Sequence, residues 1–145
     1  LFFALVGLVY GKTHTRDITK MGGLAKQMPG IAVAFTVGGL ASFGLPMTSG
    51  FISESLVFFG TFTQYPWVTV VSITGIVVTA VYVLRVVQKV FLGPTPPEWQ
   101  EMVDAKKTEW VAITSLAAIL ILVGIAPSVL TDLINHGLRA LGMNA

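Results

Sequence analysis

The stretch that decides the fold is residues 31–63, which read IAVAFTVGGLASFGLPMTSGFISESLVFFGTFT. Pro46 interrupts an otherwise apolar pattern, and Gly50 ends the uncharged linker that follows it. A proline inside a helix removes a backbone hydrogen bond and clashes with the preceding turn. The pattern therefore predicts two helical halves, residues 30–45 and 51–64, with the break at Pro46 and Gly50.

Each predicted half is too short to cross a membrane alone. A half-helix of about 15 residues reaches only ~22 Å at 1.5 Å per residue, less than the ~30 Å hydrocarbon core. Irregular backbone at membrane depth is tolerated only inside protein or beside a water-filled cavity, which suits an uncharged linker. The stretch is interpreted as one broken membrane crossing, with two short crossings as the alternative.

The basic residues discriminate between these two interpretations. With one broken crossing, all but one of the basic loop residues fall on the same side, and only Arg139 lies opposite. With two crossings, the same residues divide equally between the sides. Loops rich in Lys and Arg remain cytoplasmic, so one broken crossing is preferred, with cytoplasmic basic loops and the C-terminus outside. The residues that share one side are Lys12, Arg16, Lys20, Lys26, Lys89, Lys106 and Lys107.

The composition supports a membrane protein. Of the 145 residues, 54% are hydrophobic and 11% are charged, whereas soluble domains carry about 25% charged residues. Three long stretches without charge, residues 27–53, 55–84 and 110–131, each exceed the ~20 residues that a spanning helix needs. We therefore expect an all-α fold, a polytopic transmembrane helix bundle that forms one domain over residues 1–145.

The remaining helices are expected at residues 1–11, 67–91 and 110–127. Residues 1–11 are apolar but too short to span, and they lack a basic leader, so they are interpreted as the cut end of a membrane helix rather than as a signal peptide. The chain would then be the last part of a longer polypeptide. Residues 128–142 show the apolar spacing of an amphipathic helix that lies at a membrane interface.

Several kinds of site are not expected in this chain. A net charge of +2 and basic residues without interleaved aromatics argue against nucleic-acid binding. The sequence has no cysteine, which excludes iron–sulfur clusters and zinc–thiolate sites. His14 in a polar loop and His136 in the tail are interpreted as solvated, so no metal or haem site is predicted. The loop acids are interpreted as a solvated face, namely Glu98, Glu101, Asp104 and Glu109.

Glu54 is the residue most suggestive of chemistry, because it is the only acid between Asp17 and Glu98 and follows the break by about one turn. An ionised carboxylate facing lipid is costly, so Glu54 is expected to face protein or water, and intramembrane acids are usually functional. The start of a helix favours the charged form, whereas burial favours the neutral form. These opposed effects would let Glu54 exchange a proton near neutral pH, although a fixed structural ion pair is the alternative.

A polar stripe is predicted along the helix at residues 67–91, since Thr79, Tyr82, Arg85 and Gln88 recur at spacings of three. Such a stripe could line a wet path from the membrane interior to the cytoplasm. Alternatively, the Arg85 and Lys89 side chains only extend their charged ends to the membrane–water interface. Thr48 and Ser49 at the helix break add two hydroxyl groups, which either contact water in this path or form hydrogen bonds to backbone groups freed by the break. The candidates for the proton path are therefore Arg85, Lys89, Tyr82, Thr48 and Ser49.

Four ordered motifs then resemble a known family. They are Tyr10-Gly11-Lys12-Thr13-His14-Thr15-Arg16-Asp17, Met21-Gly22-Gly23-Leu24, Leu40-Ala41-Ser42-Phe43-Gly44-Leu45-Pro46 and Ser49-Gly50-Phe51-Ile52-Ser53-Glu54. Together they resemble the C-terminal part of the antiporter-like subunits of respiratory complex I, most of all the M-type subunit (subunit 4, chain M) of NADH-quinone oxidoreductase. The resemblance implies the last four helices of the antiporter-like fold, the second of them discontinuous.

The resemblance also implies a role for Glu54. It matches the family's acid on the broken helix, which takes part in the terminal proton transfer of the half-channel, and the sister L- and N-type subunits carry a lysine there. The family's other key groups, a glutamate and lysines on earlier helices, lie outside this chain. Arg85 stands where the family suggests an uncharged residue.

The function implied by the resemblance is that of a proton-translocating membrane subunit of NADH-quinone oxidoreductase, driven by electron transfer in partner subunits. NADH, flavin, iron–sulfur clusters and quinone are then expected in the partners, with no cofactor in this chain. The expected partners are adjacent antiporter-like subunits and the lipid bilayer, with no nucleic acid. The expected location is a bacterial inner (plasma) membrane or an equivalent energy-transducing membrane. Alternatives are a subunit of a multisubunit sodium/proton antiporter or energy-converting hydrogenase, or a passive membrane scaffold.

The single broken crossing predicts that Thr15 and Ser128 lie on opposite sides of the membrane. Single cysteines at these positions in the full-length subunit should react with an impermeant maleimide from opposite faces of oriented vesicles. Thr15→Cys should react from the cytoplasmic face and Ser128→Cys from the other. Reaction of both from one face would mean that the broken-helix count is wrong.

Overall fold

The structure is a computed structural model that describes residues 1–142, except for the side chain of Leu138. Within these residues all regular secondary structure is helical, which confirms the predicted all-α fold. Residues 143–145 of the predicted domain lie outside the described part. The α-helices are α1 (Phe2–Thr13), α2 (Pro29–Ala41), α3 (Ser49–Gln64), α4 (Pro66–Phe91), α5 (Lys107–Ile125) and α6 (Ser128–Ala140), and the short 3-10 helices are η1 (Leu24–Lys26) and η2 (Pro97–Trp99).

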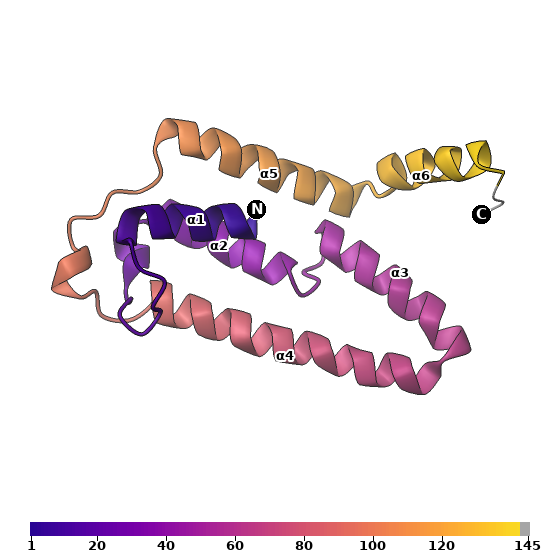
Figure 1. Cartoon of the computed structure of the whole chain (residues 1–145), viewed down its shortest axis with the longest axis horizontal. Coiled ribbons are helices and arrows are strands. Elements are labelled where there is room, and N and C mark those ends of the chain that lie inside the picture. Colours follow the sequence, from indigo (N-terminus) through magenta and orange to yellow (C-terminus); the bar gives the residue numbers. More distant parts are fainter. Residues whose placement is uncertain (143–145) are drawn as a thin grey trace.

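Helices α2 and α3 are two halves of one interrupted path along the molecule (Figure 1). They follow one another across the molecule, and the chain reverses at Tyr65 so that α4 runs back alongside both. Helix α4 has 26 residues, a length of about 39 Å at 1.5 Å per residue, which exceeds the ~30 Å apolar core. One long helix thus matches the length of two short ones, as the single broken crossing requires.

The two long loops, residues 14–28 and 92–106, lie at the same end of the molecule (Figure 1). They are joined by hydrogen bonds from the Gly23 N–H to the Leu92 carbonyl (3.1 Å) and from the Thr95 hydroxyl to the Gly23 carbonyl (3.0 Å). The Trp99 indole N–H also donates to the Lys20 carbonyl (3.1 Å). Most of the basic residues therefore gather at this end, which is called the loop end below.

The buried core also lies toward the loop end, where α1, α2 and α4 converge. Phe35 of α2 lies between two other aromatic rings, with centroid distances of 4.6 Å to Phe2 and 4.9 Å to Phe91. Leu5 and Ile31 are fully buried beside them. By contrast, every residue of α3 keeps some exposure. Half-helix α2 is thus anchored in the core, and α3 is not.

Two helices, α4 and α5, are long and apolar enough to cross a membrane. Only 6% and 11% of their most apolar windows are buried within the chain. Soluble domains rarely expose apolar surface on this scale. Large exposed side chains on α4, such as Trp67 (81%) and Val71 (69%), fit contact with lipid or with other membrane helices.

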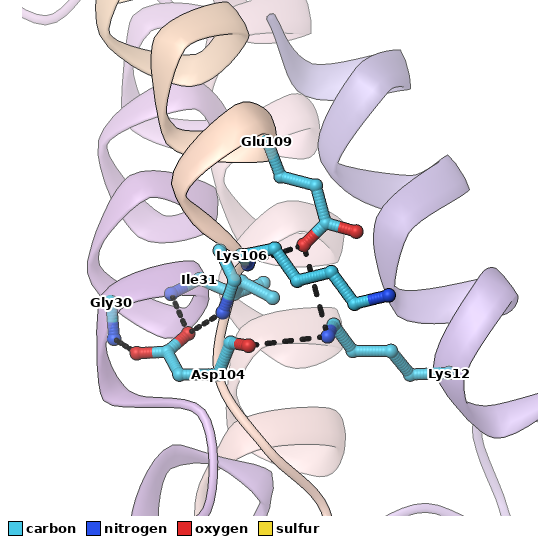
Figure 2. Close-up of polar contacts among 7 residues, drawn as sticks. Lys12, Gly30, Ile31, Asp104, Lys106 and Glu109 are labelled. Atoms are coloured by element: carbon cyan, nitrogen blue, oxygen red, sulfur yellow. Dashed lines mark hydrogen bonds and ion pairs between the residues drawn. The ribbon is translucent and has the colours of Figure 1, made fainter.

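Half-helix α2 has an N-terminal cap supplied by a distant loop (Figure 2). The Asp104 carboxylate accepts hydrogen bonds from the backbone N–H groups of Gly30 (2.7 Å) and Ile31 (3.2 Å). These are two of the N–H groups that a helix cannot satisfy internally, and a negative charge there is also favourable. Asp104 was predicted to belong to a solvated loop face, and this prediction is wrong because its carboxylate ties residues 92–106 to α2.

The start of α5 also corrects the sequence prediction. The helix was expected over residues 110–127, but it begins at Lys107 and ends at Ile125. The Glu109 carboxylate accepts a hydrogen bond from the Lys106 N–H (2.7 Å), which satisfies the first turn, and it lies 3.8 Å from the Lys12 ammonium group. Lys12 also donates to the Asp104 carbonyl (3.2 Å). Glu109 therefore joins α5 to α1 and is not simply solvated (Figure 2).

Removal of the Asp104 carboxylate should destabilise the loop end. Asp104→Ala leaves the Gly30 and Ile31 N–H groups without their acceptor, at a cost of about 1–3 kcal/mol. The thermal unfolding temperature of the full-length subunit in detergent, followed by circular dichroism, should fall. Glu101→Ala, an exposed acid of the same loop, is the matched control and should leave it unchanged. Equal unfolding temperatures for the two variants would show that the cap contributes nothing.

Candidate functional site at the helix break

Helix α2 ends in a hydrogen-bonded left-handed turn at Gly44. Gly44 has φ +81°, and its N–H donates to the Ala41 carbonyl (3.4 Å), while the Leu45 N–H donates to the Leu40 carbonyl (3.1 Å). This pair of bonds is the Schellman motif, in which glycine occupies the left-handed position. The helix was predicted to reach residue 45 and to stop at Pro46. Instead α2 ends at Ala41, the turn after it closes at Gly44, and Pro46 lies beyond this turn.

Thr48 in the linker after Pro46 bonds twice to the end of the Gly44 turn. The Leu45 carbonyl accepts hydrogen bonds from the Thr48 N–H (3.1 Å) and the Thr48 hydroxyl (2.6 Å). Thr48 is only 2% exposed. Of the two roles considered for this hydroxyl, the structure gives it a bond to the backbone freed by the break.

Two glycines let other segments pack tightly against the break. A Cβ atom at Gly50 would overlap with the Ala41 carbonyl oxygen, and one at Gly124 of α5 would overlap with the backbone of Met47 and Thr48. Helix α5 therefore packs directly against the linker backbone at Met47 and Thr48. Ser49, partly buried, lines a hollow of about 320 Å³ between the start of α3, the end of α5 and the start of α6.

The Glu54 side chain reaches back across the break toward α2. It is partly buried, and its carboxylate oxygen lies 2.6 Å from the position that a Cβ atom would take at Gly44. Among residues 1–142, no hydrogen bond or ion pair to this carboxylate is formed. The group is thus held beside the protein's own turn without being locked into a fixed ion pair.

The polar residues of α4 lie at a separate place. Tyr82, Arg85, Gln88 and Lys89 are exposed, and Thr79 is partly buried. Arg85, Gln88 and Lys89 border an open hollow of about 590 Å³ near the loop end. Among the described residues, none of these side chains forms a hydrogen bond or ion pair with Glu54. The structure brings Arg85 and Lys89 together, but not with Glu54.

The loop motif near the start of the chain forms a local polar structure. The Arg16 guanidinium lies 4.6 Å from the centre of the Tyr10 ring, a cation–π arrangement. Hydrogen bonds from the Thr19 hydroxyl and the Thr19 N–H hold the pKa of Asp17 below its usual value. His14, exposed, takes a left-handed conformation at the end of α1. The motif shapes the loop rather than adding a group to the break.

Three features of the site were missed or undervalued by sequence reasoning. Gly44 was named in a sequence motif but not as the position of the turn after α2, Gly124 was not singled out, and Asp104 was assigned to a solvated loop face. A glycine after an apolar helical run is a recognised signal for a helix end. The other two depend on segments far apart in the chain, for which a single sequence holds no local signal.

A family model described as "NADH:quinone oxidoreductase/Mrp antiporter, TM" matches residues 1–79, which include α1 to α3 and Glu54. NADH-quinone oxidoreductase subunit M of Rhodobacter capsulatus is 36% identical over 143 residues, which cover 98% of this chain and 28% of the relative. This chain therefore spans little more than a quarter of that relative's length.

Two solved structures are also similar. A chain of respiratory complex I from Thermus thermophilus with bound NADH has a TM-score of 0.80 and 31% identity, over 85% of this chain and 26% of that one. A chain of the Mrp complex from Dietzia sp. DQ12-45-1b has a TM-score of 0.78 over 89% of this chain and 32% of its own, but only 16% identity, which shows a common fold alone. The predicted resemblance to the M-type subunit of complex I is confirmed.

Proposed function

This chain belongs to the NADH:quinone oxidoreductase/Mrp antiporter transmembrane family, and we propose that it is part of a proton-translocating membrane subunit of a complex I-type NADH-quinone oxidoreductase. The observation that carries the proposal is the Glu54 carboxylate, which lies at the break of a membrane helix without a fixed partner among residues 1–142. The similarity to subunit M supports the type of complex.

In the proposed mechanism, Glu54 takes up a proton and later releases it as conformational or electrostatic changes arrive from neighbouring subunits. A permanent ion pair would oppose such cycling, because it would favour one protonation state throughout. The broken helix supports this role, since discontinuous helices place polar groups and irregular backbone together at membrane depth. Electron transfer in partner subunits supplies the driving force.

A proton leaving Glu54 for the loop end needs polar groups or water along its way. We propose Tyr82, Arg85 and Lys89 as the groups that border this route on α4. Ser49, which lines the hollow at the break, is the corresponding group there, whereas the Thr48 hydroxyl is bonded to the Leu45 carbonyl and borders the route only if that bond opens. The hollow beside Arg85 and Lys89 supports the outer part of the route because it is open and carries two cations.

The redox groups of such a complex are proposed to belong to partner subunits. The sequence has no cysteine, and residues 1–142 hold no cluster of three or more His, Asp or Glu suited to a metal ion. The side chains present therefore do not fit an iron–sulfur cluster. Adjacent antiporter-like subunits are the proposed direct partners.

We also propose that the loop end faces the cytoplasm, in a bacterial inner membrane or an equivalent energy-transducing membrane. The two long loops contact each other directly, which keeps their basic residues on one side. Positively charged loops favour the cytoplasmic side. A sodium/proton antiporter subunit is the second candidate, and it has support from the shared fold with the Mrp complex.

The experiment that tests the proposal is Glu54→Gln in the full-length subunit, assembled in its complex. Glutamine keeps the size of the side chain and removes the exchangeable carboxyl proton. Proton transfer through this subunit should fall by about 100-fold or more, measured as a lower ratio of protons pumped to electrons transferred in proteoliposomes.

The matched control is Glu101→Gln, which changes an exposed loop acid in the same way and should pump normally. A normal ratio for Glu54→Gln in a fully assembled complex would exclude the proposed role of this residue. Loss of assembly, with normal coupling in the complexes that do form, would favour a passive scaffold instead.

A further inference from the structure

We propose that Gly44 is a positioning residue for the Glu54 carboxylate, and that its lack of a side chain sets where this carboxylate lies across the helix break. This inference rests on the proposed function and assigns a second residue to the same site. It follows from three features of residue 44: its backbone conformation, the space beside its Cα atom and the kind of atom that occupies this space.

The backbone at Gly44 is the first feature. With φ +81°, it lies in the left-handed region, which glycine adopts without steric cost and other residues rarely adopt. The turn is held by two hydrogen bonds, one from the Gly44 N–H to Ala41 and one from the Leu45 N–H to Leu40. The Gly44 Cα is therefore fixed relative to α2, whose other end is held by Asp104.

The space beside Gly44 is the second feature. A Cβ atom there would lie 2.6 Å from the Glu54 carboxylate oxygen and 3.5 Å from its carboxyl carbon, whereas the nearest backbone atom, Phe51 Cα, is 3.8 Å away. The Cβ–oxygen distance is too short for non-bonded atoms, while the other two are ordinary contacts. The carboxylate thus occupies the volume that a side chain at residue 44 would take.

The third feature distinguishes Gly44 from the other glycines of the break. Gly50 and Gly124 approach rigid backbone, so a side chain at either position would push helices apart. At Gly44 the group in the way is the end of a flexible side chain. A methyl group there should displace the Glu54 carboxylate, in addition to the backbone strain that any side chain has at φ +81°.

Such a movement has a chemical consequence. The carboxylate lies beside the turn that follows α2, and it belongs to the second turn of α3, so it is near two helix ends of opposite polarity. A shift of about 1 Å changes both its electrostatic surroundings and its distance to the next proton donor or acceptor. Proton transfer is steep in such distances, so the rate and its pH dependence should both change.

The test is Gly44→Ala in the full-length subunit within its complex, compared with Gly142→Ala. Gly142 also follows a helix, has φ +73° and has nothing within 4 Å of an added Cβ, so alanine there carries similar backbone strain without touching Glu54. We expect Gly44→Ala to assemble. It should lower proton transfer through this subunit by roughly tenfold or more and shift the pH dependence of that transfer, while Gly142→Ala changes neither.

A double-mutant cycle separates positioning from a general loss of structure. Aspartate at residue 54 is one methylene shorter, which withdraws the carboxylate from residue 44. Gly44→Ala should therefore reduce pumping less in the Glu54→Asp background than in the natural one, because the two changes act on the same contact. Equal reductions in both backgrounds would overturn the inference.

The remaining outcomes are also decisive. If Gly44→Ala does not assemble, Gly44→Asn replaces it, since asparagine tolerates the left-handed region and still carries a Cβ atom. Normal pumping and an unchanged pH profile in the Ala or Asn variant would overturn the positioning role. If Glu54→Gln lowers the ratio of protons pumped to electrons transferred while the residue 44 variant does not, the proposed function stands and only the role of Gly44 is lost. Normal pumping in Glu54→Gln would remove both.

Discussion

The structure depends on one constraint, which is that a helix broken at membrane depth must satisfy its freed backbone groups without help from lipid. The chain meets it with hydrogen bonds from Gly44 and Leu45 back to the last turn of α2, and with both donors of Thr48 directed at the Leu45 carbonyl. Helix α5 then covers the linker where Gly124 allows close approach. These bonds let two short helices stand in place of one long one.

The two halves of the broken helix are held very differently, and this difference bears on the site. Half-helix α2 is capped by Asp104 at one end, closed by the Gly44 turn at the other and packed into the aromatic core through Phe35. Half-helix α3, which carries Glu54, stays partly exposed along its whole length. The Glu54 carboxylate on the less constrained half can change its position or protonation when its surroundings change. The Gly44 turn on the anchored half keeps its own position beside it.

Those parts of the fold that follow from local chemistry were predictable. The proline in an apolar stretch predicted an interrupted helix, and the lone acid shortly after it predicted Glu54 beside the break. The end of α2 was misplaced because the proline was given more weight than the glycine two residues earlier. The cap by Asp104 joins residues that are 74 positions apart, and the contact of Gly124 with the linker spans a similar separation. Such long-range contacts leave no periodic or compositional signal, so only the folded structure reveals them.

The position of the two polar regions constrains any route between them. Gly39 of α2 packs directly against Val83 of α4, so a chain of water molecules cannot pass between the two helices at this point. Tyr82, the neighbour of Val83, lies on the exposed side of α4 at 55% exposure. In the proposed function, a proton moving from Glu54 toward Arg85 and Lys89 therefore passes over this outer side of α4. Such a route is shielded from lipid only if other helices of a longer subunit, or of a partner, form its second wall.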